Sequence, residues 1–192
     1  MNKSNISLTS KQIEEELKRE EYKSKYIKII KSTIFTLIIV VSIVSIITTY
    51  LLSILEINGQ SMKPTLNEGQ IVIVYKDKSL EEGDVIAFYQ GNKILIKRVI
   101  AKSGSFVNID EEGNVSVDGK LIDEPYIDNK SLGDSDIEYP YQVPDGHYFV
   151  LGDNRDASLD SRSSEIGSVS DEDILGKVVV SVWPLDKMGI IK

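Results

Sequence analysis

The strongest pattern in the chain is an uninterrupted apolar run. From residue 32 to residue 55 no side chain is charged, and most of these 24 residues are Ile, Val or Leu. A helix of that length extends about 36 Å, enough to cross a hydrocarbon core of about 30 Å. A core helix of a soluble domain would show a polar stripe, and a secretory signal would be shorter and closer to the N-terminus. The pattern predicts a transmembrane helix over residues 32–55.

Charge on the two sides of this run predicts its orientation. Residues 1–31 carry eight Lys/Arg and five Asp/Glu, a net charge of +3. The whole chain carries −8, so the rest carries −11. Positive flanks stay on the cytoplasmic side of a membrane. We therefore expect a single-pass protein of the cell membrane, with residues 1–31 as a cytoplasmic segment and residues 56–192 outside.

Beyond residue 56 the pattern changes to short β-branched runs separated by Gly, Asn and Asp. Closely spaced strands without intervening helices are typical of all-β domains. We predict an all-β fold, a compact sheet or partial barrel, and interpret residues 127–142 as an exposed loop. The predicted strands are residues 71–75, 85–89, 94–100, 106–109, 115–117, 147–151 and 177–183.

Composition removes several classes of chemistry. The chain has no cysteine and one histidine, so a thiolate nucleophile and a cysteine-ligated metal are excluded. With a single histidine, the chain is a poor candidate for a Ser-His-Asp site and for a multi-histidine metal site. The acidic outer part argues against nucleic acid as a partner, because that binding depends on basic phosphate contacts. Any general base is to be sought among lysines and carboxylates.

The first candidate group is Ser61, in the segment Gly59–Leu66 that begins four residues after the apolar run ends. Gly59 allows close backbone approach, and Pro64 fixes the chain shortly after Ser61. A hydroxyl becomes a nucleophile only when a base removes its proton and fixed donors stabilise the oxyanion. By itself the segment fits an ordinary turn from a membrane anchor into a domain better than it fits a nucleophile.

Lys97 supplies a candidate base. It lies in an apolar strand, on the face of Leu95 and Val99, whereas Arg98 points the other way. Burial lowers the pKa of a lysine because it disfavours the charged form. Activity as a base near neutral pH requires a fall of about 3 from about 10.4. The alternative is a lysine that reaches solvent or protects a sheet edge.

A third stretch, Gly152–Arg162, reads GDNRDASLDSR. It follows a strand of buried type and contains two Asp/Arg pairings among small polar residues. Its alternating carboxylates resemble a calcium loop superficially, but the bidentate glutamate and flanking helices of an EF-hand are missing. A solvated turn remains the simple alternative to a network that holds a serine and a lysine together.

In this order, behind one apolar span, the three stretches resemble the bacterial type I signal peptidases. The resemblance rests on Ser61-Met-Lys-Pro-Thr65, Gly83-Asp-Val85, Lys97-Arg-Val-Ile100 and Gly152–Arg162. It implies a membrane-anchored serine endopeptidase that removes signal peptides from secreted preproteins. In this family Ser61 corresponds to the nucleophile and Lys97 to the general base, and neither a metal nor a cofactor is used.

The same resemblance assigns supporting roles within Gly152–Arg162. Ser158 corresponds to the serine that orients the lysine. Asp160 and Arg162 correspond to a supporting ion pair, and Asp153 and Arg155 to structural members of the same stretch.

The substrate is expected to lie extended beside the segments around residues 57–60 and 94–96, with small side chains at positions −1 and −3. Besides preproteins, the lipid bilayer is an expected partner. The candidate substrate-binding residues are Ile57, Gln60, Met62, Leu66, Leu95 and Ile96.

Two departures from the family pattern keep alternatives open. Ala101-Lys-Ser-Gly-Ser105 replaces the usual Gly-x-Pro-Gly-Asp, and Gly59 stands where some members carry a second oxyanion-binding serine, as in many Gram-positive relatives. The rivals are a membrane-anchored β-domain that binds peptides without cleaving them and a Ser-Lys self-cleaving protease of the repressor type.

Overall fold

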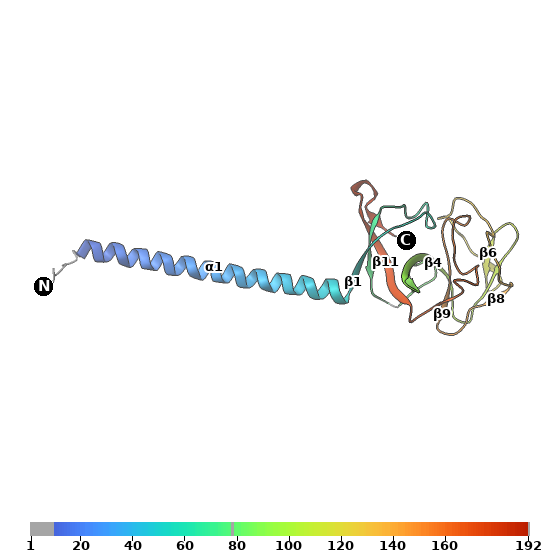
Figure 1. Ribbon diagram of the computed structural model, residues 1–192, viewed down its shortest axis with the longest axis horizontal. Helices are drawn as coiled ribbons and strands as arrows, with labels where there is room; N and C mark the ends of the chain where they lie inside the picture. Colours follow the sequence, from blue (N-terminus) through green and yellow to red (C-terminus); the bar gives the residue numbers. More distant parts are fainter. Residues whose placement is uncertain (1–9, 78, 192) are drawn as a thin grey trace. The chain divides into compact units, whose positions relative to one another are not determined.

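A computed structural model describes residues 10–77 and 79–191, so residues 1–9 of the expected N-terminal segment lie outside the described part. The chain divides into two compact units, residues 1–47 and residues 48–192 (Figure 1). The first is helical, and the second contains the strands. The prediction of an all-β fold preceded by one apolar helix is confirmed.

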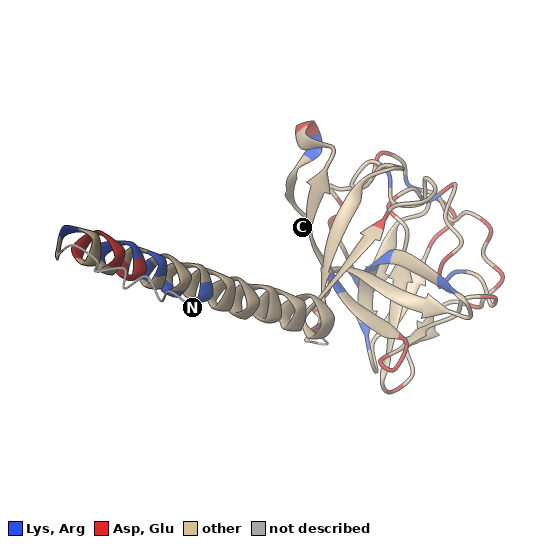
Figure 2. Ribbon diagram, turned by 60° about the vertical axis from the view of Figure 1, so that its left-hand side comes forward, with Lys and Arg blue, Asp and Glu red and all other residues tan. Residues whose placement is uncertain are grey.

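The described part of the first unit lies within a single helix, α1, which spans Ser10–Tyr50. Figure 2 shows that the charged residues of this helix gather in its N-terminal part and that the apolar remainder contains none. Pairs such as Lys18–Glu14 and Lys23–Glu20 are solvent-exposed and contribute little stability. Among the described residues this is the one helix long and apolar enough to cross a membrane.

The C-terminal end of the predicted helix is corrected from Leu55 to Tyr50. Leu52–Glu56 forms strand β1, whose residues pair one by one with those of strand β2, Ile71–Tyr75. A short apolar segment has the same pattern in a strand and in a buried helix, so only its pairing partner decides. The charge-free helical part, residues 32–50, still extends about 28 Å, close to the thickness of a bilayer core.

The second unit is built on an eight-stranded antiparallel sheet. Its strands follow the order β1-β2-β11-β3-β4-β9-β10, with β12 beside β11. The path does not return from β10 to β1, so the sheet is not a closed barrel. The further bounds are β3 Val85–Gln90, β4 Lys93–Lys102, β9 His147–Leu151, β10 Val169–Ser170, β11 Ile174–Trp183, the 3-10 helix η1 Leu185–Lys187 and β12 Gly189–Ile190.

A second, four-stranded sheet has the order β7-β6-β5-β8. The departure from the family pattern, residues 101–105, ends β4 and turns into β5 through Gly104 at φ +86°. The amide of Ser105 closes this turn on the carbonyl of Lys102 at 3.2 Å. The strands are β5 Phe106–Ile109, β6 Val115–Val117, β7 Lys120–Leu121 and β8 Tyr141–Gln142.

Strand β4 connects the cores of the two sheets. Val99 packs in the cluster of the large sheet with Phe88 and Val150, whereas Ile100 and Ala101 pack in the cluster of the small sheet. Its second half is therefore buried on both faces. Both basic side chains at the middle of β4, Lys97 and Arg98, consequently lie inside the protein.

Residues 127–142 are less exposed than predicted. Leu132, Ile137 and Tyr139 pack against the small-sheet core, and Tyr141–Gln142 pairs with β5. This segment forms one wall around Gly152–Arg162.

Candidate functional site

Ser61 and Lys97, which are 36 residues apart, meet in a direct hydrogen bond. The ammonium or amine nitrogen Nζ of Lys97 lies 2.7 Å from Oγ of Ser61. Ser61 stands in the turn that follows β1, and Lys97 in the middle of β4. The serine is half-buried, and the lysine is only 3% exposed. This geometry permits direct proton transfer between the two side chains.

The surroundings of Lys97 favour its neutral form. Burial is the largest influence and lowers its pKa from 10.5 to about 8. The charge of Asp160 opposes this fall, the charge of Arg162 assists it, and Asp153 opposes it again. Among the described residues no carboxylate forms an ion pair with Lys97, since both nearby aspartates pair with arginines. A substantial fraction of Lys97 is thus unprotonated in mildly alkaline conditions.

The peptide group that joins Gln60 to Ser61 is held from two sides. The side-chain amide of Asn154 donates to the Gln60 carbonyl at 3.2 Å, and so does the amide of Lys63. The backbone amide of Asn154 donates to the carbonyl of Ser61 at 3.0 Å. The Gln60 carbonyl and the Ser61 N–H belong to one planar group, so these contacts also orient that N–H.

Close backbone approach explains why Gly152 stands behind the serine. A Cβ at residue 152 would lie 2.5 Å from the Ser61 carbonyl oxygen and 2.2 Å from Oγ of Ser158. Any side chain there would force the turn away from Lys97. Gly152 is therefore a packing requirement of the site.

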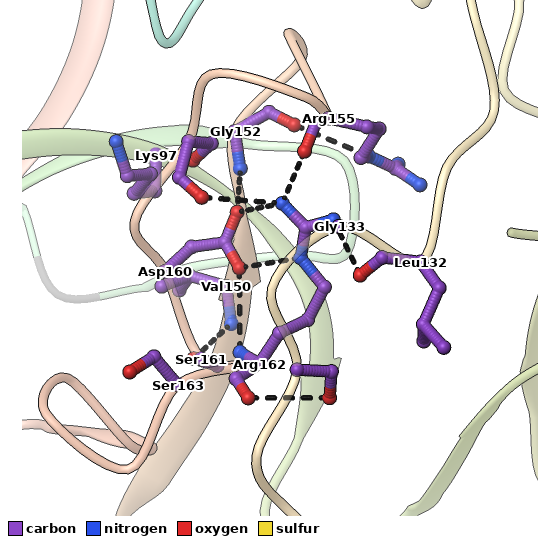
Figure 3. Close-up of polar contacts among 12 residues, drawn as sticks. Lys97, Leu132, Gly133, Val150, Gly152, Arg155, Asp160, Ser161, Arg162 and Ser163 are labelled. Carbon is purple, nitrogen blue, oxygen red and sulfur yellow. Dashed lines mark hydrogen bonds and ion pairs between the residues drawn. The ribbon is translucent and has the colours of Figure 1, made fainter.

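Asp160 and Arg162 form a buried pair directly beneath Gly152 (Figure 3). The guanidinium approaches the two carboxylate oxygens at 2.8 and 2.9 Å. Asp160 also accepts the Gly152 amide at 2.9 Å. The remaining donors of Arg162 reach the carbonyls of Leu132 and Arg155 at 2.9 and 2.8 Å. Every charged group in this pair therefore has partners, as burial requires.

Gly133 allows the loop 127–142 to close over Arg162. Its φ of +61° favours glycine, and a Cβ there would lie 2.6 Å from Nη1 of Arg162. Figure 3 shows Leu132 and Gly133 against the guanidinium.

Asp153 and Arg155 do not pair with each other, and each binds a partner outside the stretch. Asp153 binds Arg98 of β4 through two hydrogen bonds of 2.9 and 2.7 Å. Arg155 instead pairs with Glu124, and both side chains are fully buried. Tyr126 lies under the Arg98 guanidinium, 3.9 Å from ring centroid to Cζ.

Sequence reasoning missed Arg98, Glu124 and Asn154 as parts of the site. Arg98 was placed on the opposite face from Lys97, which is correct, but that face is also buried. Glu124 carried no local signal, since its partner is 31 residues away. Asn154 lay within the singled-out stretch, and an amide beside a turn was a signal that could have been followed.

Ser158 lies beside the site without the contact expected of it. Its Oγ is buried and has no hydrogen-bond partner among the described residues. The hydroxyl is packed against Gly152. No hydrogen bond to Lys97 is formed in this structure, so the expectation that Ser158 orients the lysine stays a prediction.

Ser61 and Lys97 open into a cleft of about 370 Å³. Of the six candidate substrate-binding residues, Ile57, Met62, Leu95 and Ile96 line it. Leu66 does not: it is fully buried in the core, which corrects that assignment. Gln60 does not line it either and contributes its carbonyl to the turn. Asn58, Gly59 and Ile94, which lie in the two segments expected beside the substrate, also line the cleft. Sequence reasoning missed Leu55, Glu56 and Asn92, which line it as well.

The two walls of the cleft are strand edges or their extensions. Strand β4 pairs with β9 only from Arg98 onward, so residues 93–97 have no strand on that side. Because Val99 bonds toward β3, alternation directs the N–H and C=O groups of Ile94 and Ile96 toward the open side. The cleft can thus accept an extended peptide as an added strand.

Comparisons with known proteins identify one family. Residues 27–183 match the profile of the family described as signal peptidase, peptidase S26. Signal peptidase IB of Staphylococcus aureus is 35% identical over 166 residues, 76% of this chain and 85% of that protein. A probable signal peptidase I-2 of Synechocystis is 34% identical over 158 residues, 76% of this chain and 69% of that protein.

A crystal structure of a signal peptidase I from Enterococcus faecalis V583 is also similar. It has 27% sequence identity and a TM-score of 0.43, and the match covers 52% of this chain and 97% of that one.

Proposed function

The chain belongs to the signal peptidase S26 family, and from this premise we propose that it cleaves signal peptides with Ser61 as nucleophile and Lys97 as general base. The observation that carries the proposal is the 2.7 Å hydrogen bond between the hydroxyl of Ser61 and the buried amine of Lys97. The lowered pKa of Lys97, about 8, supports it because a base must be unprotonated to accept a proton.

The proposed reaction has two steps. Neutral Lys97 takes the proton of Ser61 while Oγ bonds to the scissile carbonyl carbon. The C–N bond then breaks, the leaving amine takes the proton from Lys97, and an acyl-enzyme remains. In the second step Lys97 takes a proton from water, whose oxygen attacks the ester. The Ser61 oxygen leaves and recovers the proton.

The oxyanion is expected to bind the N–H of Ser61. Gly59 has a φ of +94° and brings no hydroxyl of its own. The hydrogen bonds from Asn154 and Lys63 to the Gln60 carbonyl orient the peptide that carries this N–H. They also polarise the peptide, which strengthens the N–H as a donor. We therefore assign Asn154 a positioning role.

The substrate is a secreted preprotein, whose cleavage segment adds as a strand to the open edge of β4. Main-chain groups of Ile94 and Ile96 pair with it, and apolar side chains of Ile57, Met62 and Leu95 form shallow walls. Such walls accept the small residues found at positions −1 and −3 of signal peptides.

The membrane anchor determines on which side of the membrane the proposed active site lies. Helix α1 anchors the protein, and the basic residues before its apolar part keep the N-terminus in the cytoplasm. The β unit then lies outside, on the side where translocated preproteins emerge.

Cleavage of a purified preprotein tests this function. Full-length protein in micelles should release the mature chain, with the new N-terminus read by mass spectrometry. Ser61→Ala and Lys97→Ala should each lose activity by about a thousandfold or more. Lys102→Ala, which removes an exposed lysine on the same strand, is the matched control and should retain it.

Two outcomes would contradict the proposal. An intact preprotein after incubation with the wild-type protein would leave a peptide-binding domain as the better description. Normal cleavage by Lys97→Ala would exclude Lys97 as the base.

A further inference from the structure

The catalytic cleft continues into a second, more apolar groove. Both are lined by Leu55 and Ile94, which stand at their junction. Away from Ser61 the groove is bounded by Leu52 and Ile54 of β1, Ile73 of β2, Tyr89 of β3 and Leu175 of β11. The groove therefore continues the space between β1 and β4 beyond the part of the cleft that contains Ser61 and Lys97.

The chemistry of the groove differs from that of the cleft. Ile54 and Tyr89 are 66% and 47% exposed, which is a high exposure for two large apolar side chains on neighbouring parts of one surface. Among the described residues, Lys76 is the one charged side chain in its lining, and its Nζ donates to the carbonyl of Thr49 at 2.9 Å. The cleft, in contrast, contains Glu56, Asn58 and Asn92. The groove thus favours an apolar ligand.

Strand edges in the space between β1 and β4 are free to pair with that ligand. β1 pairs with β2 alone, so its other edge is open along residues 52–56. The amide of Ile57 bonds toward β2, so alternation directs the main-chain groups of Ile54 and Glu56 to the open side. An extended peptide can bond to β4 near Ser61 and to β1 further along.

We propose that this groove binds the apolar segment of the signal peptide that lies N-terminal to positions −1 and −3. The proposal rests on the function given above. A strand rises about 3.3 Å per residue, so the three steps from Lys97 to Ile94 correspond to about 10 Å, or to the three steps from substrate position −1 to position −4. The groove therefore begins near position −4. In a signal peptide the apolar segment precedes the cleavage site, whereas the mature part has no common chemistry.

Substrate length gives the sharpest test. Two peptides share one cleavage site: a short one that starts at position −3, and a long one that adds an apolar segment upstream. Ile54→Ser and Tyr89→Ser, in full-length protein at fixed micelle composition, should lower the ratio of kcat/KM for the long to the short peptide about tenfold. The reason is lost apolar contact, and the effect should lie in KM.

Matched controls separate the groove from a general apolar surface. Tyr75→Ser and Ile190→Ser remove residues that are 40% and 78% exposed and do not line the groove. Both should leave the ratio as in the wild type. The proposal would be overturned if the control variants lowered the ratio as much as the groove variants do. It would also be overturned if the groove variants lowered kcat/KM equally for both peptides. Either result would indicate that the groove contacts lipid or detergent instead.

Binding keeps this test independent of catalysis. Fluorescence anisotropy of the labelled long peptide on the Ser61→Ala background gives a Kd without turnover. Addition of Ile54→Ser should raise that Kd about tenfold and should not change the Kd of the short peptide. An unchanged Kd for the long peptide would reject the groove. If the wild type cleaves neither peptide, the proposed function fails, and the Kd still decides the groove.

Discussion

Lys97 and Arg98 are neighbours on one strand, both are basic, and both are almost completely buried. Their surroundings are nevertheless opposite. Arg98 is bound by both oxygens of Asp153 and by the Gly83 carbonyl, and it stacks on Tyr126. Lys97 meets only the hydroxyl of Ser61 among the hydrogen bonds of the described residues. One strand therefore holds, side by side, a guanidinium paired with a carboxylate and a lysine that contacts a hydroxyl.

The comparison teaches that the partners of a buried base decide its role. A guanidinium stays protonated and satisfies a carboxylate bidentately. An ammonium without a carboxylate is disfavoured by burial, so its pKa falls. The carboxylates near Lys97 are already engaged: Asp153 by Arg98 and Asp160 by Arg162. The two arginines thereby keep the aspartates from stabilising the charged form of Lys97 by direct pairing.

The largest expected effect is a pair of opposite changes in stability. Arg98→Met leaves Asp153 buried without its cation and should lower the free energy of unfolding by about 3–5 kcal/mol. Lys97→Met should raise it at pH 7, because the difference between 10.5 and about 8 corresponds to about 3 kcal/mol as an upper value. Thermal unfolding followed by near-ultraviolet circular dichroism measures both.

The lowered pKa of Lys97 explains why Lys97→Met should increase the free energy of unfolding. The folded state disfavours the proton, so the cost is complete below pH 8 and disappears as the pH approaches 10.5. The advantage of Lys97→Met should shrink over that interval. Lys102→Met, at an exposed pair, is the control and should change stability by less than about 1 kcal/mol. Destabilisation by Lys97→Met at pH 7 would contradict the claim that burial of Lys97, unlike that of Arg98, costs stability.

The next effect is on the pH dependence of cleavage. If neutral Lys97 is the base, kcat/KM should rise about tenfold per pH unit below pH 8 and level off above it. Initial rates measured between pH 6 and pH 9.5 give the profile. A flat profile over this range would show that kcat/KM does not depend on the protonation state of Lys97.

A smaller effect is expected from Asn154. Asn154→Ala removes one hydrogen bond to the Gln60 carbonyl, so kcat should fall about tenfold while KM stays close to that of the wild type. Asn154→Gln can restore a donor and should recover part of the loss. An equal rise in KM with unchanged kcat would instead assign Asn154 to substrate binding.

The smallest effect concerns Ser158, whose buried hydroxyl has no partner among the described residues. Ser158→Ala removes an unsatisfied group and should stabilise the protein by about 1 kcal/mol. Calorimetry measures this, with Ser163→Ala as a nearby control. If activity falls although stability rises, Ser158 acts on Lys97 during the reaction. A loss of stability would show that the hydroxyl has a partner in solution.

Much of the architecture followed from local pattern. Alternation and turn residues predicted the strands and the all-β domain, and the charge-free run predicted an apolar helix. The end of that helix did not follow, because Leu52–Glu56 is decided by its pairing with Ile71–Tyr75. The burial of Leu66 did not follow either. The sequence does not show whether an apolar residue after a turn points into the core or into the cleft.

The candidate site was predictable where one short motif carries each group, as for Ser61 and Lys97. Long-range partners were not. Arg98 and Asp153 are 55 residues apart, and Arg155 and Glu124 are 31 apart. Nothing local distinguishes such partners from surface charges. Their pairing depends on β4 being buried on both faces, which only the arrangement of the two sheets establishes.

A direct titration of Lys97 tests the central claim, that this buried lysine can act as a base near neutral pH. Nitrogen-15 NMR of Nζ in lysine-labelled protein, assigned by loss of the signal in Lys97→Arg, follows its protonation from pH 6 to pH 11. The account predicts a pKa of about 8. A pKa at or above the ordinary value of 10.5 would contradict it, since Lys97 would then be charged whenever cleavage occurs.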